Sequence, residues 1–318
     1  MTLLVAVRGA GDNWAPEKWL VRFQQRLPDM PVALFGRDTP DPVAVRYVAA
    51  WQPPPGLLAG YPQLAAIFNL GAGVDALLRD PTLPPVPLVR VVNPDLTQRM
   101  TEYVVLHVLM HHRQQRLLDR SQAARQWTTP EQWPAAKLRV GIMGLGELGL
   151  DAAAVLTRLG FQVAGWSRSP KTVPGVPCFS GSDGLGPFLA RTDVLVVLLP
   201  LTADTRGLLN RALFTKLAKD GPLGAPVLIN AGRGGLQVEA DIISCLDDGT
   251  LGAASLDVFE REPLAADHPL WSHRQVTVTP HNAADSDPEA ISDYVVSQIR
   301  RHQRGEPLTN VVARDRGY

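Results

Sequence analysis

The amino-acid sequence predicts an α/β protein with two doubly wound parallel sheets, each forming its own domain. Three observations predict this class. Short apolar runs that end in glycine, proline or another turn residue alternate with helical patterns along the chain. A long segment without glycine or proline, residues 97–127, divides these runs into two series. The 318 residues, 45% apolar and 19% charged, suffice for two globular domains of ordinary size.

The first series predicts the strands of one parallel sheet, with helices expected over residues 16–27 and 74–78. Its apolar runs cover residues 3–7, 32–35, 48–51, 66–69 and 89–92. The second series begins after residue 137 and covers residues 138–143, 162–166, 194–199, 227–230, 253–257 and 275–279. A last helical pattern occupies residues 289–304. We therefore expect a discontinuous first domain, residues 1–97 plus 287–318, and a dinucleotide-binding domain over residues 98–286.

The segment 97–127 predicts either one unusually long helix or two helices in sequence. Its second half is strongly polar, which a simple core helix does not explain. We expect it to bridge the domains or to reach a second subunit, and we predict a homodimer. His107 and His111 in this segment have a possible metal-ligand spacing, but no third ligand accompanies them. We therefore expect ordinary histidines on the helix surface and no metal site.

Charge and cysteine content exclude several classes of function. Lys plus Arg and Asp plus Glu both number 31, so a net charge of zero argues against nucleic acid or a membrane surface as the main partner. The only two cysteines, Cys178 and Cys245, form no C-x-x-C motif and fit a reducing compartment. The N-terminal apolar run is too short for a signal peptide, and no apolar stretch reaches 18 residues. These features predict a cytoplasmic protein.

The sharpest motif is a glycine fingerprint, Gly144-x-Gly146-x-x-Gly149, between an apolar run and a helical pattern. Gly144 permits a tight turn, Gly146 lets a pyrophosphate approach the backbone, and Gly149 lets the helix pack close to the strand. The amide groups at the start of the helix, with Glu147 and Leu148 in its first turn, then face the pyrophosphate. The motif predicts a nicotinamide dinucleotide site.

The next apolar run indicates which dinucleotide binds. An NAD site usually carries Asp or Glu at the end of this strand, but residues 162–171 contain no carboxylate. Arg168, with Ser167 and Ser169 on either side and Lys171 nearby, could instead hold a 2′-phosphate by charge-assisted hydrogen bonds. The sequence therefore predicts that NADPH is preferred and that NADH remains possible.

Three residues of different chemistry follow three of the predicted strands. They are Arg233, Glu262 and His281. Because ligands of open α/β sheets bind at the carboxyl ends of the strands, these side chains could converge.

These motifs together resemble the D-isomer-specific 2-hydroxyacid dehydrogenase family, and more closely its glyoxylate/hydroxypyruvate reductase branch. The resemblance covers the whole chain and rests on the glycine fingerprint, the three segments just described and the segments 69–75, 99–103, 198–205 and 316–318. It implies a Rossmann cofactor domain and a flavodoxin-like substrate domain, with substrate bound between them. It also implies that Arg233, Glu262 and His281 form the catalytic set for reduction of a 2-oxo acid. In that reaction hydride reaches the carbonyl carbon and negative charge grows on oxygen. Arg233 would bind the substrate and polarise that oxygen, His281 would donate the proton, and a Glu262 partner would favour the imidazolium.

The resemblance implies further binding residues. Backbone amides of Ala72 and Gly73 would bind the substrate carboxylate as an anion nest, and Trp51 would close over small substrates. The nicotinamide half of the cofactor would contact Pro200, Thr205, Ala231, Gly232 and Asp257. Gly232 is a departure, because many family members carry a side chain there.

The implied reaction is reduction of glyoxylate and hydroxypyruvate to glycolate and D-glycerate with NADPH. Two alternatives remain open from the sequence. One is a dehydrogenase for a bulkier 2-oxo acid. The other is a nicotinamide-sensing interaction protein, which would need the glycine fingerprint but not Arg233, Glu262 and His281.

Overall fold

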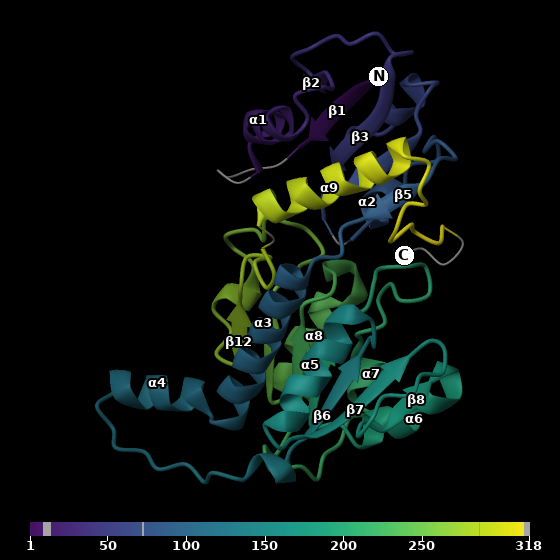
Figure 1. Ribbon diagram of the computed structural model, residues 1–318. Coiled ribbons are helices and arrows are strands. Elements are labelled where there is room, and N and C mark those ends of the chain that lie inside the picture. Colours follow the sequence, from purple (N-terminus) through teal and green to yellow (C-terminus); the bar gives the residue numbers. More distant parts are fainter. Residues whose placement is uncertain (9–13, 72, 286, 315–318) are drawn as a thin grey trace. The chain divides into compact units, whose positions relative to one another are not determined.

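The computed structural model describes residues 1–8, 14–71, 73–285 and 287–314. It contains two compact units, one formed by Met1–Leu96 with Ser286–Tyr318 and the other by Thr97–Asp285. Each unit is built on one parallel sheet with helices packed against it (Figure 1). We describe the two units separately, as unit 1 and unit 2.

Unit 1 has a five-stranded sheet in the order β2-β1-β3-β4-β5, with all neighbouring strands parallel. Its strands are β1 (Thr2–Val7), β2 (Val32–Leu34), β3 (Val45–Trp51), β4 (Ala66–Asn69) and β5 (Leu88–Arg90). Its helices are α1 (Pro16–Arg26), α2 (Asp75–Leu78) and α9 (Pro288–Gln303), with a 3-10 turn η2 (Leu57–Gly60). This strand order is that of flavodoxin-like folds, so the predicted fold of this unit is confirmed.

Unit 2 has a seven-stranded parallel sheet in the order β12-β11-β10-β9-β6-β7-β8. Its strands are β6 (Arg139–Met143), β7 (Gln162–Ser167), β8 (Cys178–Ser180), β9 (Val194–Val197), β10 (Val227–Asn230), β11 (Ala253–Leu256) and β12 (Val276–Val278). Its helices are α3 (Pro94–His112), α4 (Gln115–Ala123), α5 (Glu147–Arg158), α6 (Gly181–Ala190), α7 (Arg211–Phe214) and α8 (Glu239–Asp247). The first residues of α3 belong to unit 1. Short 3-10 turns are η3 (Ala135–Lys137), η4 (Gly234–Leu236) and η5 (Pro269–Trp271). If β6 is numbered as the first strand of this unit, the strands β8-β7-β6-β9-β10-β11 lie in the Rossmann order 3-2-1-4-5-6. The predicted fold class is therefore confirmed.

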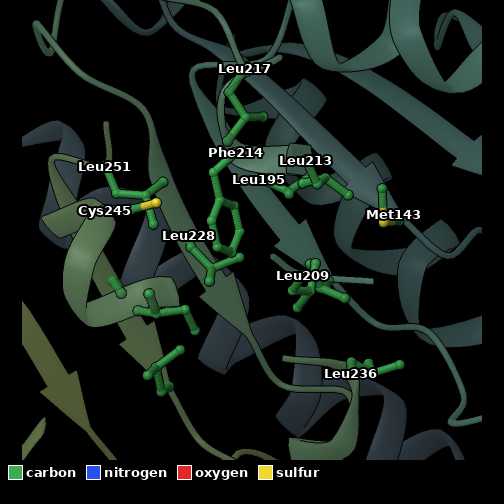
Figure 2. Packing of buried hydrophobic residues seen from close by; sticks show 14 of the residues in the cluster. Met143, Leu195, Leu209, Leu213, Phe214, Leu217, Leu228, Leu236, Cys245 and Leu251 are labelled. Atoms are coloured by element: carbon green, nitrogen blue, oxygen red, sulfur yellow. The ribbon is translucent and has the colours of Figure 1, made fainter. Parts of the chain in front are cut away.

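The central strands of unit 2 read as continuous apolar runs because both faces of the sheet are buried. Successive residues point to opposite faces. Thus Val194 and Val196 of β9 join one apolar cluster, whereas Leu195 and Val197 join the other. Figure 2 shows part of this second cluster, in which Leu195 lies among side chains of neighbouring elements that include Phe214. The carboxyl ends of these buried strands carry the site.

The segment after residue 97 forms two helices, the second of the two alternatives that the sequence left open. Helix α3 ends at His112 and α4 begins at Gln115, because Gln114 adopts a left-handed conformation with φ of 55° between them. Helix α4 and the loop that follows it extend away from the sheet of unit 2 (Figure 1). Trp127 in that loop is 96% exposed.

Within the described ranges, no helix is both long enough and apolar enough to cross a membrane.

Candidate active site

The glycine fingerprint forms a tight turn between β6 and α5. Gly144 has φ of 112°, in the region that favours glycine, and its amide donates to the carbonyl of Trp166 at 2.9 Å. Gly146 is the N-cap of α5, so the unpaired amides of the first helical turn begin at this point. The turn therefore presents backbone donors and the positive end of a helix dipole to an anion.

Gly149 and Gly146 show why the fingerprint has glycine at its positions. A Cβ at Gly149 would lie 1.9 Å from the carbonyl oxygen of Gly144, which no side chain tolerates. A Cβ at Gly146 would meet none of the described protein atoms within 4 Å, so internal packing does not require glycine there. Close approach of a ligand does explain it. The residues present thus fit a bound dinucleotide pyrophosphate.

The end of β7 carries the residues predicted to select the cofactor. Ser167 is buried and donates its hydroxyl to the carbonyl of Ser169 at 2.8 Å, which tightens this turn. Arg168, between them, is exposed, and the last residues of the strand include no carboxylate. The turn can therefore offer a guanidinium to a phosphate on the adenosine ribose.

The segment after β9 is a hydrogen-bonded turn closed by Thr205. The Thr205 hydroxyl donates to the carbonyl of Pro200 at 2.8 Å and accepts from the amide of Thr202 at 2.8 Å. The turn follows directly from the strand that neighbours the glycine fingerprint strand in the sheet. Pro200 and Thr205 therefore lie at the edge of the sheet where a dinucleotide binds.

Asn230 at the end of β10 organises the loop that carries Arg233. Its side-chain oxygen accepts from the amide of Gly232 at 3.0 Å, and its side-chain nitrogen donates to Gln237 Oε1 at 2.8 Å and to the Arg233 carbonyl at 3.3 Å. Asn230 and Gln237 are both buried. At Gly232 itself, a Cβ would lie 2.8 Å from the carbonyl oxygen of Leu199, so the departure from the family pattern matches close packing here.

The segment leading to Glu262 packs directly on this arginine loop. A Cβ at Gly234 would lie 1.8 Å from the carbonyl oxygen of Phe259, so only glycine permits the approach. The Arg233 side chain donates from Nη1 to the carbonyl of Gly232 at 2.7 Å. One carboxylate oxygen of Glu262 accepts from the Phe259 amide at 3.0 Å. The two loops therefore hold Arg233 and Glu262 near each other.

Glu262 and His281 form a direct pair. Nδ1 of His281 lies 2.7 Å from Oε2 of Glu262, and the two side chains are 46% and 36% exposed. Burial raises the pKa of Glu262, but the hydrogen bonds from His281 and the Phe259 amide and the positive charge of Arg233 outweigh it, so the pKa falls below its ordinary value. Glu262 therefore pairs with His281 and feels the charge of Arg233 in the structure.

The carboxylate of Asp257 fixes the loop on which His281 lies. It accepts from the Thr279 hydroxyl at 2.6 Å and from the amides of Asn282 and Ala283 at 3.0 and 3.1 Å. The Asp257 carbonyl accepts from the His281 amide at 2.8 Å. His281 has φ of 54°, a conformation that costs about 1–3 kcal/mol outside glycine, and these bonds offset that cost.

Helix α3 extends this network into the protein interior. The hydroxyls of Tyr103 and Thr279 lie 3.0 Å apart, and Nε2 of His111 lies 2.9 Å from the Ser255 hydroxyl. The expectation that His107 and His111 lie on the helix surface is wrong, because they are only 3% and 8% exposed. Burial lowers the pKa of His107 and lowers that of His111 to about 3. Both are therefore neutral core residues.

The loop predicted to bind the substrate carboxylate follows β4 in unit 1. Ala72 lies outside the described residues, as do the last four residues of the chain. Buried Asn69 donates to the carbonyls of Gly71 and Gly73 at 2.6 and 3.0 Å, which shapes the loop around it. Trp51, at the end of β3, is half-buried, and its ring touches Gly71.

Sequence reasoning missed five polar residues that hold these loops, four of them buried and Thr279 half-buried. They are Asn69, Tyr103, Asn230, Gln237 and Thr279. The available signal was a polar residue at the end of an apolar run, as at Asn69 and Asn230. Such a residue either reaches a ligand or holds the loop that does, and the sequence does not distinguish the two.

Among the residues that the structure describes, no group of three or more His, Cys, Asp or Glu side chains is arranged to hold a metal ion.

A dinucleotide-binding sheet whose strand ends also carry a carboxylate-paired imidazole and a guanidinium defines a nicotinamide-dependent oxidoreductase. Comparison with known proteins places the chain within that class. Residues 105–283 match the model of the D-isomer specific 2-hydroxyacid dehydrogenase NAD binding domain. Glyoxylate/hydroxypyruvate reductase A of Yersinia enterocolitica is 39% identical over 308 residues, covering 95% of this chain and 96% of that protein.

Two solved structures are similar over the full chain. The NADPH-dependent glyoxylate/hydroxypyruvate reductase of Sinorhizobium meliloti, in complex with NADP and sulfate, matches with a TM-score of 0.93 and 46% identity over 100% of this chain and 99% of that one. A probable 2-hydroxyacid dehydrogenase of Rhizobium etli, in complex with NADP, HEPES and L(+)-tartaric acid, matches with a TM-score of 0.94 and 45% identity over the same shares. The chain belongs to the D-isomer specific 2-hydroxyacid dehydrogenase family. The predicted family and enzyme class are therefore confirmed. The Yersinia and Sinorhizobium proteins are named glyoxylate/hydroxypyruvate reductases, and both solved structures contain NADP.

Proposed function

We propose that this protein reduces glyoxylate and hydroxypyruvate to glycolate and D-glycerate with NADPH. The observation that carries the proposal is the pairing of His281 with Glu262 beside Arg233, at the carboxyl ends of the dinucleotide-binding sheet. A proton donor, its carboxylate partner and a fixed positive charge are what reduction of a carbonyl to a hydroxyl requires from the protein.

The chemistry divides among the three side chains. When NADPH is bound, it supplies the hydride that adds to the carbonyl carbon. Arg233 binds the 2-oxo acid and stabilises the negative charge that grows on the carbonyl oxygen. His281 uses Nδ1 for Glu262, so Nε2 donates the proton to that oxygen. Glu262 fixes the ring and favours its protonated form.

Other residues would hold the cofactor and the substrate. The amides of Glu147 and Leu148 at the start of α5 face the pyrophosphate, and Arg168 pairs with the 2′-phosphate. Pro200, Thr205, Ala231, Gly232 and Asp257 surround the nicotinamide half. In unit 1, the amides of Ala72 and Gly73 bind the substrate carboxylate, and Trp51 limits its size.

We further propose that the protein is a cytoplasmic homodimer joined through unit 2. We expect Trp127 to anchor the partner subunit, because its indole is 96% exposed on an extended loop and Trp is enriched at the energetically important positions of interfaces. Two hydrogen bonds tie this loop to the residues that follow α3. Gln114 donates to the Glu131 carbonyl at 2.6 Å, and Arg113 donates to Gln132 at 2.7 Å. The free thiols Cys178 and Cys245 suit a reducing compartment.

The two alternatives predict different results in one experiment. NADPH and NADH oxidation would be followed spectrophotometrically with glyoxylate, hydroxypyruvate, pyruvate and a branched 2-oxo acid. We expect the highest kcat/KM with NADPH and the two smallest substrates. Preference for the branched acid would support the dehydrogenase for bulkier acids. Cofactor binding without turnover on any acid would support the sensing protein.

A further inference from the structure

Trp51 is held from two sides within unit 1. Its ring stacks on that of Trp14, with ring centroids 4.7 Å apart and an angle of 27° between the planes. On another side it touches the backbone at Gly71, where a Cβ would lie only 2.2 Å from Cζ3 of the indole. Such contacts leave the ring little freedom to turn.

Trp14 is itself tied to the hydrophobic core of this unit. Its ring centroid lies 5.4 Å from that of Trp19, which is fully buried in α1. Trp19 in turn lies 6.1 Å from Phe23 in a stacked arrangement. The aromatic series Phe23, Trp19, Trp14, Trp51 thus runs from the core to a half-buried indole, and it gives Trp51 a rigid support.

The contact with Gly71 relates this indole to the loop that we propose for the substrate carboxylate. Asn69 fixes the same loop by donating to the carbonyls of Gly71 and Gly73. Because the indole and the loop are both fixed, the space that they leave for a substrate has a set size. In a 2-oxo acid the group attached to C2 begins at C3, which lies two bonds from the carboxylate carbon. A fixed indole beside the carboxylate site therefore limits the size of that group.

We propose that Trp14 is a positioning residue that sets the substrate size limit by holding Trp51 against Gly71. Trp14 itself need not touch the substrate. This inference rests on the proposed function, in which Trp51 and the loop at Gly71 and Gly73 face the 2-oxo acid.

The test compares Trp14→Ala with the wild-type protein on glyoxylate and on phenylpyruvate, both with NADPH. We expect the ratio of kcat/KM for glyoxylate to kcat/KM for phenylpyruvate to fall about three- to tenfold, the equivalent of one lost aromatic pair. The KM for NADPH should stay unchanged. Trp14→Phe, which retains a stacking ring, should keep most of the selectivity. Phe35→Ala, which removes an exposed aromatic ring of the same unit, should leave the ratio unchanged.

A double-mutant cycle with Trp51→Ala separates positioning from general support of the fold. If Trp14 acts through Trp51, then Trp14→Ala changes the ratio in the wild-type background and not in Trp51→Ala. Should Trp14→Ala fail to fold, Trp14→Leu keeps an apolar side chain there but removes the stack, and the same ratio should fall. Equal loss of kcat/KM for both acids, or the same change of the ratio in both backgrounds, would overturn the inference alone. A wild-type protein that reduces no 2-oxo acid would overturn the proposed function and this inference with it.

Discussion

Nδ1 of His281 lies 2.7 Å from Oε2 of Glu262, and this contact assigns a task to each ring nitrogen. Nδ1 serves the carboxylate, and Nε2 is the atom from which a substrate can take a proton. The same carboxylate accepts the Phe259 amide through its other oxygen, so its orientation is fixed from both sides. The pair therefore holds the imidazole in one orientation before any substrate arrives.

Replacement of Glu262 by Gln should move the pH profiles to lower pH. Reduction requires protonated His281, and Glu262, whose pKa is lowered by this pairing, stays ionised at neutral pH and favours the imidazolium. Without that charge, kcat/KM for glyoxylate should begin to fall at a lower pH than in the wild type. Glycolate oxidation, which needs the neutral ring, should begin to rise at the correspondingly lower pH. Profiles that coincide with those of the wild type would remove Glu262 from this role.

Arg168→Ala should weaken use of NADPH specifically. The lost charged contact with the 2′-phosphate should raise the KM for NADPH about ten- to a hundredfold and leave the KM for NADH nearly unchanged. Arg158→Ala, at the other end of α5 from the glycine turn, is the matched control and should change neither value. An equal loss with both cofactors would mean that Arg168 supports the fold rather than the phosphate.

Thr279→Val should lower turnover without weakening cofactor binding. The hydroxyl of Thr279 lies between Tyr103 and Asp257, and its loss leaves the Asp257 carboxylate with fewer donors to hold the His281 loop. We expect kcat to fall about tenfold with little change in the KM for NADPH. Thr279→Ser keeps the hydroxyl and should retain most of the activity. A Val variant as active as the Ser variant would show that the hydrogen bonds of the Thr279 hydroxyl do not support turnover.

Trp127→Ala should weaken the dimer. Burial of an aromatic anchor is typically worth about 2 kcal/mol or more, so the dimer Kd should rise about thirtyfold. Light scattering over a concentration series should give the wild type a mass near twice the 34.5 kDa of the chain and the variant a mass that falls on dilution. Trp271→Ala, which removes another exposed indole of unit 2, should behave as the wild type. A wild-type protein that stays at the mass of one chain would contradict the proposed interface.

Much of the fold could be predicted because buried parallel strands leave continuous apolar runs with turn residues at their ends. Strand β8 was missed, because it has three half-buried residues at the edge of the sheet and shows no such run. The burial of His107 and His111 was missed as well. They follow Tyr103 at helical spacing and share the buried side of α3 with Val104 and Val108, but their polarity suggested the surface.

The candidate catalytic residues could be predicted because each follows a strand, and strands of one parallel sheet end at the same edge. The pairing of His281 with Glu262 could not be derived from spacing alone. It depends on the Asp257 carboxylate, which binds the residues on both sides of His281, and on the Phe259 amide, which turns Glu262 toward it. These are contacts between loops far apart in the sequence, and no local pattern encodes them.

The measurement that tests the central claim most directly is the rate of NADPH oxidation by glyoxylate in the wild type and in His281→Ala, with NADPH affinity measured separately by fluorescence. We predict rapid oxidation by the wild type, a kcat about a hundred- to ten-thousandfold lower in the variant, and an unchanged Kd for NADPH. Near-normal turnover by His281→Ala would contradict the account, because the proton would then come from another group.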